Sequence, residues 1–262
     1  MTTAEGTRPE AHATAAGRTE VRLSAVVPVY NERECVEPLW ERLAPVLDAT
    51  GSSWETVFVD DGSSDGTAEI LERLARERPR VRVVRLLQNR GQTAALSAGF
   101  AHARGEWIVT LDADLQNPPE EIPRLLAAVD GVDLVYGRRR VRHDGWAKRI
   151  GSRIGNGVRN LVTGHFVHDT GCSLKLFRRN ALARIPLFHG MHRFLPTLFE
   201  FHGFRTREVE VAHEPRAAGT SKYGNLGRAW RGLYDCFAVR WMRSRSLRYE
   251  SVEIDNGRAD DP

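Results

Sequence analysis

The sequence predicts an α/β protein whose mostly parallel β-sheet carries helices on both faces. Short runs rich in β-branched residues alternate with longer helical stretches from Leu23 onward. Strand–helix–strand repetition at this pace implies right-handed crossovers and a covered sheet. The chain has 262 residues, 41% hydrophobic and 27% charged, which is ample for a buried core. Ligands of such sheets bind at the carboxyl ends of the strands.

Five strands with four intervening helices are predicted before residue 140. The strands are expected at Leu23–Val29, Glu55–Val59, Val81–Leu86, Glu106–Leu111 and Val132–Tyr136. The helices are expected at Cys35–Asp48, Thr67–Arg78, Gln92–Arg104 and Glu120–Val129. The second of these helices follows capping residues at Ser64 and Asp65, and the fourth has proline and acid in its first turn.

The chain changes character after Gly137. Asp144 is the only acid in a stretch with many basic side chains: Arg138, Arg139, Arg140, Arg142, Lys148, Arg149, Arg153 and Arg159. A further strand is expected at Thr206–Ala212. A loop should follow at Pro215–Tyr223, where proline, glycine and small residues concentrate.

Composition limits the class of protein and its location. Lys and Arg number 38 against 34 Asp and Glu, a net charge of +4. The three cysteines are far apart and form no C-x-x-C, which argues against a disulfide scaffold or a cysteine-based zinc site. No run approaches the roughly 18–20 apolar residues of a membrane span, and no secretory signal is recognisable. We expect a cytoplasmic protein with disordered tails over residues 1–20 and 251–262.

Polar residues follow three of the predicted strands. They are Pro28-Val-Tyr-Asn-Glu32, Asp60-Asp-Gly-Ser-Ser-Asp65 and Asp112-Ala-Asp-Leu-Gln116. Asp112 and Asp114 are two residues apart, so their carboxylates point the same way if strand geometry persists. Such a pair suits Mg²⁺ or Mn²⁺, with substrate phosphates completing the shell. A solvated turn is the alternative interpretation.

Taken together, these segments resemble the family-2 glycosyltransferases. The matching segments are Val26–Glu32, Val59–Gly66, Asn89–Ala95, Leu111–Pro119 and Asp169–Arg179, followed by Arg216, Gly219, Ser221 and Lys222. The chain looks most like the branch that glycosylates polyprenyl phosphates, exemplified by dolichol-phosphate mannose synthase. The resemblance implies a GT-A type nucleotide-sugar-binding fold, with a catalytic domain over residues 21–225.

The resemblance also implies where a nucleotide-sugar donor, a GDP- or UDP-sugar, would bind. Pro28, Tyr30 and Glu32 would line the nucleoside pocket. Asp61 would contact the base or ribose, with Gln92 nearby. Spacing alone does not define the nucleotide or the sugar.

By the same resemblance, Asp112, Asp114 and Gln116 form the site for Mg²⁺ or Mn²⁺, with Asp114 the principal ligand. A departing nucleoside diphosphate gains negative charge, which the ion and nearby cations can neutralise. Arg216, Ser221 and Lys222 would contact the same diphosphate, and a solvated basic loop is the alternative. The expected catalytic residues are Asp112, Asp114 and Arg216.

A polyprenyl phosphate acceptor removes the need for a catalytic base. A phosphate monoester is mostly dianionic at pH 7 and can attack the sugar directly, with inversion. Similar enzymes hold this phosphate with Arg and Ser, which implies Arg138, Arg149, Ser152 and Arg153. A solvated basic face is the alternative. Nucleic acid is not an expected partner, because no helix-turn-helix, zinc or RNP signature accompanies the basic residues.

Residues 226–250 predict an amphipathic helix. Its apolar face comprises Leu226, Trp230, Leu233, Tyr234, Phe237, Trp241 and Met242, and arginines surround it. Such a helix suits a membrane surface or an integral-membrane partner protein, and packing on the catalytic domain is the alternative. We therefore expect peripheral attachment at the inner face of the membrane.

The sequence thus predicts an inverting hexosyltransferase, or a related pentose-transferring enzyme, that acts on a dolichyl- or undecaprenyl-type phosphate. One alternative is transfer to a hydroxyl of a polysaccharide or glycolipid, for which Glu200 or Asp235 could be the base. The other is a nucleotide- or polyanion-binding module without catalysis. The intact Asp112 and Asp114 pair argues against that module.

Overall fold

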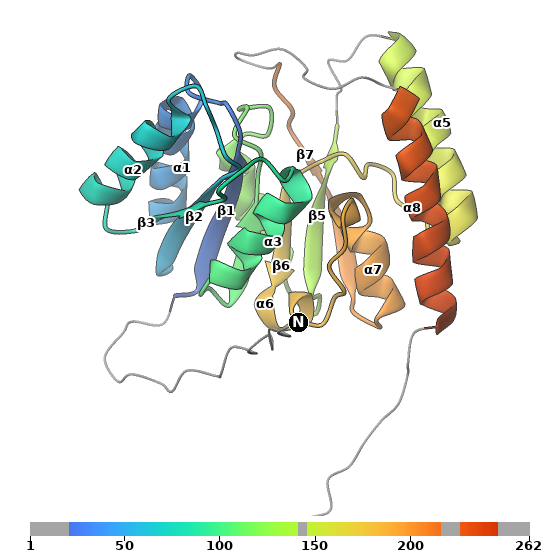
Figure 1. Ribbon diagram of the computed structural model, residues 1–262. Coiled ribbons are helices and arrows are strands. Elements are labelled where there is room, and N and C mark those ends of the chain that lie inside the picture. Colours follow the sequence, from blue (N-terminus) through green and yellow to red (C-terminus); the bar gives the residue numbers. More distant parts are fainter. Residues whose placement is uncertain (1–20, 141–145, 216–225, 246–262) are drawn as a thin grey trace, which may run out of the picture.

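A computed structural model describes residues 21–140, 146–215 and 226–245, in which seven strands form one sheet (Figure 1). The strand order is β3-β2-β1-β4-β6-β5-β7. The pairings of β6 with β4 and β5 are antiparallel, and the other pairings are parallel. The predicted fold class, a mostly parallel sheet flanked by helices, is confirmed. The two predicted tails lie outside the described residues.

The first half of the chain follows the predicted order of elements. These are β1 (Leu23–Val29), α1 (Val36–Ala49), β2 (Trp54–Asp60), α2 (Thr67–Glu77), β3 (Val81–Arg85), α3 (Gln92–His102), β4 (Trp107–Thr110), the 3-10 helix η1 (Pro119–Glu121) and α4 (Ile122–Leu126). The single helix predicted over Glu120–Val129 is therefore divided and shorter. Pro123 has no N–H to donate, and the turn before it closes through Ile122 N and Pro119 O.

The second half contains elements that the sequence did not predict. Its elements are β5 (Leu134–Arg139), α5 (Trp146–Thr163), β6 (Lys175–Arg178), α6 (Arg179–Leu182), the 3-10 helix η2 (Met191–Arg193), α7 (Leu195–Phe201), β7 (Thr206–Val211) and α8 (Leu226–Arg245). The short strand β6 enters the sheet between β4 and β5. It comes from the Asp169–Arg179 motif and brings that motif beside the end of β4.

Alternating side chains of the central strands build a core on each face of the sheet. Ala25 and Phe58 face a cluster with α1, α2 and α4. Val26 and Val57 face a second cluster with α3, α6, α7 and α8. A Cβ at Gly99 would lie 2.3 Å from Val26 Cγ1, so the glycine lets α3 pack directly on β1.

Helices α5 and α8 pack against each other at the side of the molecule remote from α1 and α2 (Figure 1). Arg240 Nη1 donates to Val162 O at 3.0 Å, and Arg243 Nη1 donates to Thr163 O at 3.1 Å. These bonds satisfy carbonyls of the last turn of α5. In the described part of the chain, no helix is both long and apolar enough to cross a membrane.

Candidate active site

Three predicted site segments end at the same edge of the sheet, because β1 pairs in parallel with both β2 and β4. The loops after β1 and β2 are bonded to each other. Asn31 N donates to Ser63 Oγ at 2.9 Å, and Ser64 N donates to Asn31 Oδ1 at 2.8 Å. Asn31 has a φ of 52°, a left-handed conformation that asparagine tolerates. Beside it lie three half-buried residues of the predicted nucleoside pocket: Pro28, Tyr30 and Glu32.

Asp61 binds the loop that leads into α3. Its carboxylate accepts hydrogen bonds from Arg90 N at 2.7 Å, Gly91 N at 2.8 Å and Asn89 Nδ2 at 2.9 Å. A Cβ at Gly62 would lie 2.7 Å from Asn89 N, so the two loops approach too closely for a side chain there. Asp61 is 3% exposed and holds this edge of the site in shape. Its contact with a base or ribose stays a prediction.

The predicted neighbours Gln92 and Asp112 are in contact. Gln92 Nε2 donates to Asp112 Oδ1 at 2.8 Å. The strand ends at Thr110, and Asp114 Oδ1 accepts from Gln116 N at 3.2 Å within a turn. Strand geometry therefore does not persist to Asp114, so the condition under which we expected the two carboxylates to point the same way is not met. The turn nevertheless keeps both carboxylates at the tip of β4.

The two carboxylates form an acidic pair suited to a cation. Burial and the charge of Asp114 raise the pKa of Asp112 to about 6. A nearby divalent ion would favour the ionised form. Within the described ranges, no group of three His, Cys, Asp or Glu side chains could enclose a metal ion. The oxygen donors at the tip of β4 fit Mg²⁺ or Mn²⁺ with substrate oxygens in the remaining positions.

Ser173 belongs to this site, although the sequence assigned it no role. Its Oγ accepts from Asp112 N at 3.2 Å and from Asn117 Nδ2 at 2.8 Å. Thr110 Oγ1 donates to Ser173 O at 2.7 Å. A hydrogen bond from the Ser173 side chain also works against the rise in the pKa of Asp112. The segment before β6 thus fixes the turn that carries the acidic pair. The Asp169–Arg179 motif was the feature of the sequence that could have pointed to Ser173.

Two cations lie on the far side of this turn. Lys175 is 4% exposed, and its Nζ donates to Cys172 O. Burial lowers the pKa of Lys175. Arg139 forms a two-pronged ion pair with Asp169, through Nε at 2.6 Å and Nη2 at 2.8 Å. Both cations oppose the rise in the pKa of Asp112, so they favour its ionised form.

The structure describes only some of the residues that the sequence predicts to bind phosphates. Arg138 is ion-paired with Glu210 of β7, which compensates its charge. Helix α5 carries Arg149, Ser152 and Arg153, whose side chains are not described. Arg216, Ser221 and Lys222 lie outside the described residues. The roles predicted for these residues remain predictions.

The chain just before Arg216 is anchored beside the turn of β4. Glu214 N donates to Gln116 O at 2.9 Å. Arg42 of α1 donates to Glu214 Oε2 at 2.9 Å and to Glu120 Oε2 at 2.8 Å. Hydrogen bonds to these two acids raise the pKa of Arg42. This clamp joins α1, η1 and the segment that leads to the predicted diphosphate-binding loop.

A mostly parallel sheet with linked loops at one edge and an acidic pair at the tip of β4 is the architecture of a GT-A glycosyltransferase. Residues 24–185 match the model of the family described as glycosyl transferase family 2. The chain belongs to this family, and it is a glycosyltransferase. The resemblance inferred from the motifs is confirmed.

Relatives place the chain in the polyprenyl-phosphate branch of the family. It is similar to the undecaprenyl-phosphate 4-deoxy-4-formamido-L-arabinose transferase of Edwardsiella ictaluri, with 46% identity over 231 residues, covering 86% of this chain and 70% of the relative. The protein of the same name from Proteus mirabilis is 43% identical over 207 residues, covering 78% of this chain and 64% of the relative.

Solved structures show the same fold. Glucosyl-3-phosphoglycerate synthase from Mycobacterium tuberculosis, in complex with Mg²⁺ and UDP, has a TM-score of 0.64 and 20% sequence identity, covering 84% of this chain and 80% of that one. Its complex with Mn²⁺, UDP-glucose and phosphoglyceric acid has a TM-score of 0.62 at 20% identity, with the same coverage. The predicted GT-A fold is confirmed.

Proposed function

We propose that this glycosyltransferase moves a sugar from a nucleotide-sugar donor to the phosphate of undecaprenyl phosphate. One observation carries the proposal: relatives with 40–46% identity over most of the chain are named for transfer to undecaprenyl phosphate. The acidic pair at the tip of β4, with Gln92 bonded to Asp112, supports a nucleotide-sugar donor.

The proposed sugar is the pentose of the two sugar classes that the sequence allowed. The name of these relatives specifies 4-deoxy-4-formamido-L-arabinose, which is a pentose. We therefore replace the expected hexosyl transfer with transfer of a pentose of this type. The donor nucleotide is left open between GDP and UDP.

The donor would lie across the carboxyl edge of β1, β2 and β4. Asp112, Asp114 and Gln116 would hold Mg²⁺ or Mn²⁺, which would neutralise charge that develops on the departing diphosphate. Arg216 and Lys222 would add positive charge to the same group, and Ser221 a hydrogen bond. The base and ribose would contact the predicted pocket residues: Pro28, Tyr30, Glu32 and Asp61.

A phosphate acceptor agrees with the position of Glu200, one of the two candidate bases for a hydroxyl acceptor. Its carboxylate accepts from Thr206 Oγ1 at 2.8 Å and pairs with His165 Nε2 at 2.9 Å. Thr206 begins β7, whereas the active-site edge lies at the ends of the parallel strands. Glu200 is therefore at the wrong edge of the sheet to deprotonate an acceptor. A dianionic phosphate needs no base, and its direct attack would invert the sugar.

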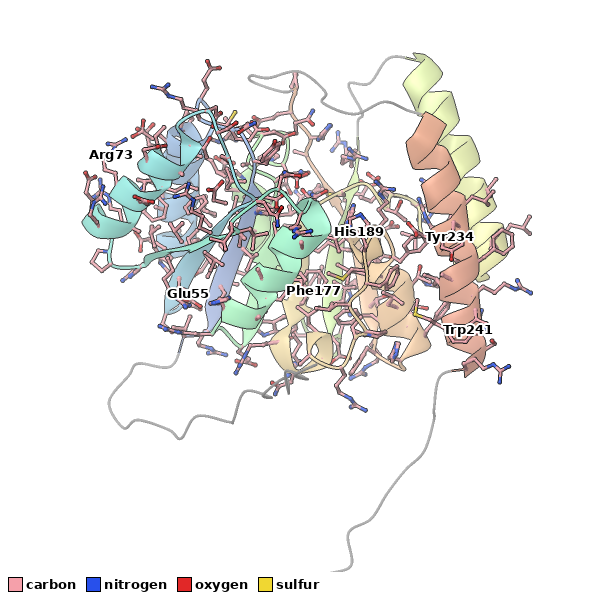
Figure 2. All side chains as sticks on the ribbon, in the orientation of Figure 1. Glu55, Arg73, Phe177, His189, Tyr234 and Trp241 are labelled. Carbon is pink, nitrogen blue, oxygen red and sulfur yellow. The ribbon has the colours of Figure 1, made fainter. Side chains whose placement is uncertain are left out.

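The outer surface of α5 and α8 supports attachment to a membrane. We name this the apolar helix surface; its exposed side chains are Val158 and Leu161 of α5, Tyr234, Phe237 and Trp241 of α8, and Phe166 just after α5. Figure 2 shows Tyr234 and Trp241 on α8, at the side of the molecule remote from α2. Exposed Arg240 and Arg245 accompany them, which suits anionic lipid at the inner membrane face. An integral-membrane partner is the alternative occupant.

The test is a transfer assay with purified protein, Mn²⁺ or Mg²⁺ and a short polyprenyl phosphate. The donors are GDP- and UDP-linked sugars, including 4-deoxy-4-formamido-L-arabinose. We expect a lipid product that mild acid cleaves and mild base does not. A hydroxyl-bearing glycolipid is offered in parallel. Transfer to that hydroxyl, with none to the phosphate, would contradict the proposal.

A further inference from the structure

Arg159 is a half-buried cation with few partners. Its Nη1 donates to Asn156 Oδ1 at 2.9 Å, and its Cζ lies 5.7 Å from the centre of the Phe194 ring. No Asp or Glu of the described residues lies within ion-pair distance of it. A guanidinium carries five N–H donors, so most of its donor capacity is not used by these contacts.

Two other half-buried arginines of the described chain are paired with acids. Arg139 binds Asp169 through two nitrogens, and Arg82 binds Glu55 at 2.9 Å. A charge removed from water is costly unless an opposite charge or several hydrogen bonds replace the water. Arg159 differs from these two, and none of its nitrogens is a buried donor without a partner, so its remaining N–H groups can reach solvent or a bound anion.

The environment of Arg159 is positive as well as partly desolvated. Burial lowers its pKa, and the neighbouring cation Arg193 acts in the same direction. Asp169 acts in the opposite direction, but its carboxylate is held by Arg139. Cys236, the other nearby titratable side chain, is buried with its thiol pKa raised by burial, so it supplies no negative charge near pH 7.

A chain of contacts connects Arg159 with the acidic pair. Phe194, on which the guanidinium stacks, follows η2, and His192 Nδ1 of η2 lies 2.9 Å from Thr93 Oγ1. Thr93 adjoins Gln92, whose side chain bonds Asp112. His189, just before residues 190–194, approaches the start of α3, since a Cβ at Gly91 would lie 3.8 Å from His189 Cε1. These contacts link Arg159, through the segment at residues 190–194, with the start of α3 beside Asp112.

We propose that Arg159 binds a phosphate group of a substrate between α5 and the segment at residues 190–194. The inference rests on the proposed function, because that function supplies two phosphate-bearing substrates. One is the monoester of the polyprenyl acceptor, and the other is the diphosphate of the donor. Both offer oxygens that match the planar fork of a guanidinium. Arg159 was not among the predicted acceptor ligands, whereas Arg138 was, and Arg138 is already paired with Glu210.

The experiment compares Arg159→Gln and Arg159→Lys with a matched control, Arg184→Gln. Arg184 also stacks on a phenylalanine, with its Cζ 5.5 Å from the Phe204 ring centre, but it is exposed to water. Binding is measured by calorimetry with a short polyprenyl phosphate in detergent, and separately with UDP and GDP in the presence of Mn²⁺. The KM values for acceptor and donor are measured in the transfer assay.

We expect Arg159→Gln to weaken binding of one phosphate compound about ten-fold or more, as for loss of a charged hydrogen bond. Arg159→Lys should lose less affinity, because it keeps the charge. Arg184→Gln should bind the phosphate compounds as tightly as the parent does. Weakened polyprenyl phosphate binding assigns the group to the acceptor, and weakened nucleotide binding assigns it to the donor. Unchanged binding of both by a folded Arg159→Gln protein would overturn the inference.

Failure of the proposed function can be distinguished from failure of the role proposed for Arg159. If the parent protein transfers no sugar to polyprenyl phosphate, the calorimetric comparison still tests Arg159 against phosphate compounds. If the parent transfers the sugar and both Arg159 variants match it in affinity and in KM, the function stands and the role of Arg159 is rejected. Thermal unfolding of each variant checks that the comparison is made between folded proteins.

Discussion

The loops after β1, β2 and β4 differ sharply from the helix pair α5 and α8. In the loops, polar side chains bind each other: Asn31 exchanges bonds with the loop after β2, and Asp61 binds three groups before α3. In the helix pair, Leu161 is 80% exposed and Trp241 is 63% exposed. The polar side chains of the loops bind groups within the protein, whereas the helix pair exposes apolar side chains to its surroundings.

The difference suggests two physical roles. A nucleotide site depends on fixed positions for a few polar atoms, so hydrogen bonds within the protein that hold the loops reduce the ordering needed on binding. Contact with a lipid surface depends on apolar area and charge rather than on exact positions. The predictions below test whether the two regions divide the work in this way, from the largest expected effect to the smallest.

Asp114→Asn should lower kcat about 1,000-fold, the scale of losing one strong electrostatic contact to developing charge. The asparagine keeps the size of the side chain, so thermal unfolding should change little. Mn²⁺ binding, followed by electron paramagnetic resonance with UDP or GDP present, should weaken in parallel. A variant with normal turnover would show that the acidic pair does not hold the metal ion.

Asp61→Ala should lower the free energy of unfolding by about 3 kcal/mol, because three donors before α3 lose the buried carboxylate that accepts from them. Urea denaturation without donor measures this effect. Glu72→Ala is the matched control, since the Glu72 side chain is 50% exposed and its surface pairs with Arg76 and Arg85 should contribute less than about 1 kcal/mol. An equal loss of unfolding free energy in both variants would contradict the inference that Asp61 fixes the loop before α3.

Asp112 should make the stability of the metal-free protein depend on pH. Its pKa rises from 3.8 to about 6 on folding, so the folded chain binds this proton more tightly than the unfolded chain. Ionised Asp112 therefore costs stability above about pH 6, and this cost disappears as the pH falls from 6 towards 3.8. The free energy of unfolding of Asp112→Asn should exceed that of the parent by about 3 kcal/mol at pH 8 and by little at pH 4.

Urea denaturation of both proteins in a metal chelator, at several pH values, measures this difference. A constant gap between the two proteins over the whole range would show that Asp112 ionises normally. The result would also indicate whether the fixed loops hold an unfavourable pair of charges in readiness for a cation.

Local patterns were sufficient to predict the first half of the fold. Leu23–Val29 was predicted with the bounds that the structure has, and Asp112 and Gln92 were expected at one site and are in contact. The first result follows from a pattern along the chain, because buried strands are continuous apolar runs. The second was implied by the resemblance to the family.

The rest depended on pairings between distant segments. Strand β6 has four residues, and it joins β4 and β5 in the antiparallel sense. No local pattern reveals such an insertion, so the contact of Ser173 with Asp112 could not be derived. Similarly, Arg138 and Arg139 are adjacent in sequence, yet one binds Glu210 and the other Asp169.

Trp241→Ser should weaken binding to vesicles that contain anionic phospholipid about ten-fold, because burial of one large apolar side chain is lost. Leu87→Ser is the matched control: Leu87 is 99% exposed but lies beside β3, in the other region. Sedimentation with vesicles measures both variants, and thermal unfolding should change little in either. Equal vesicle binding by both variants would remove the apolar helix surface from the membrane contact. A large loss of stability in Trp241→Ser alone would instead show that this face of α8 serves packing.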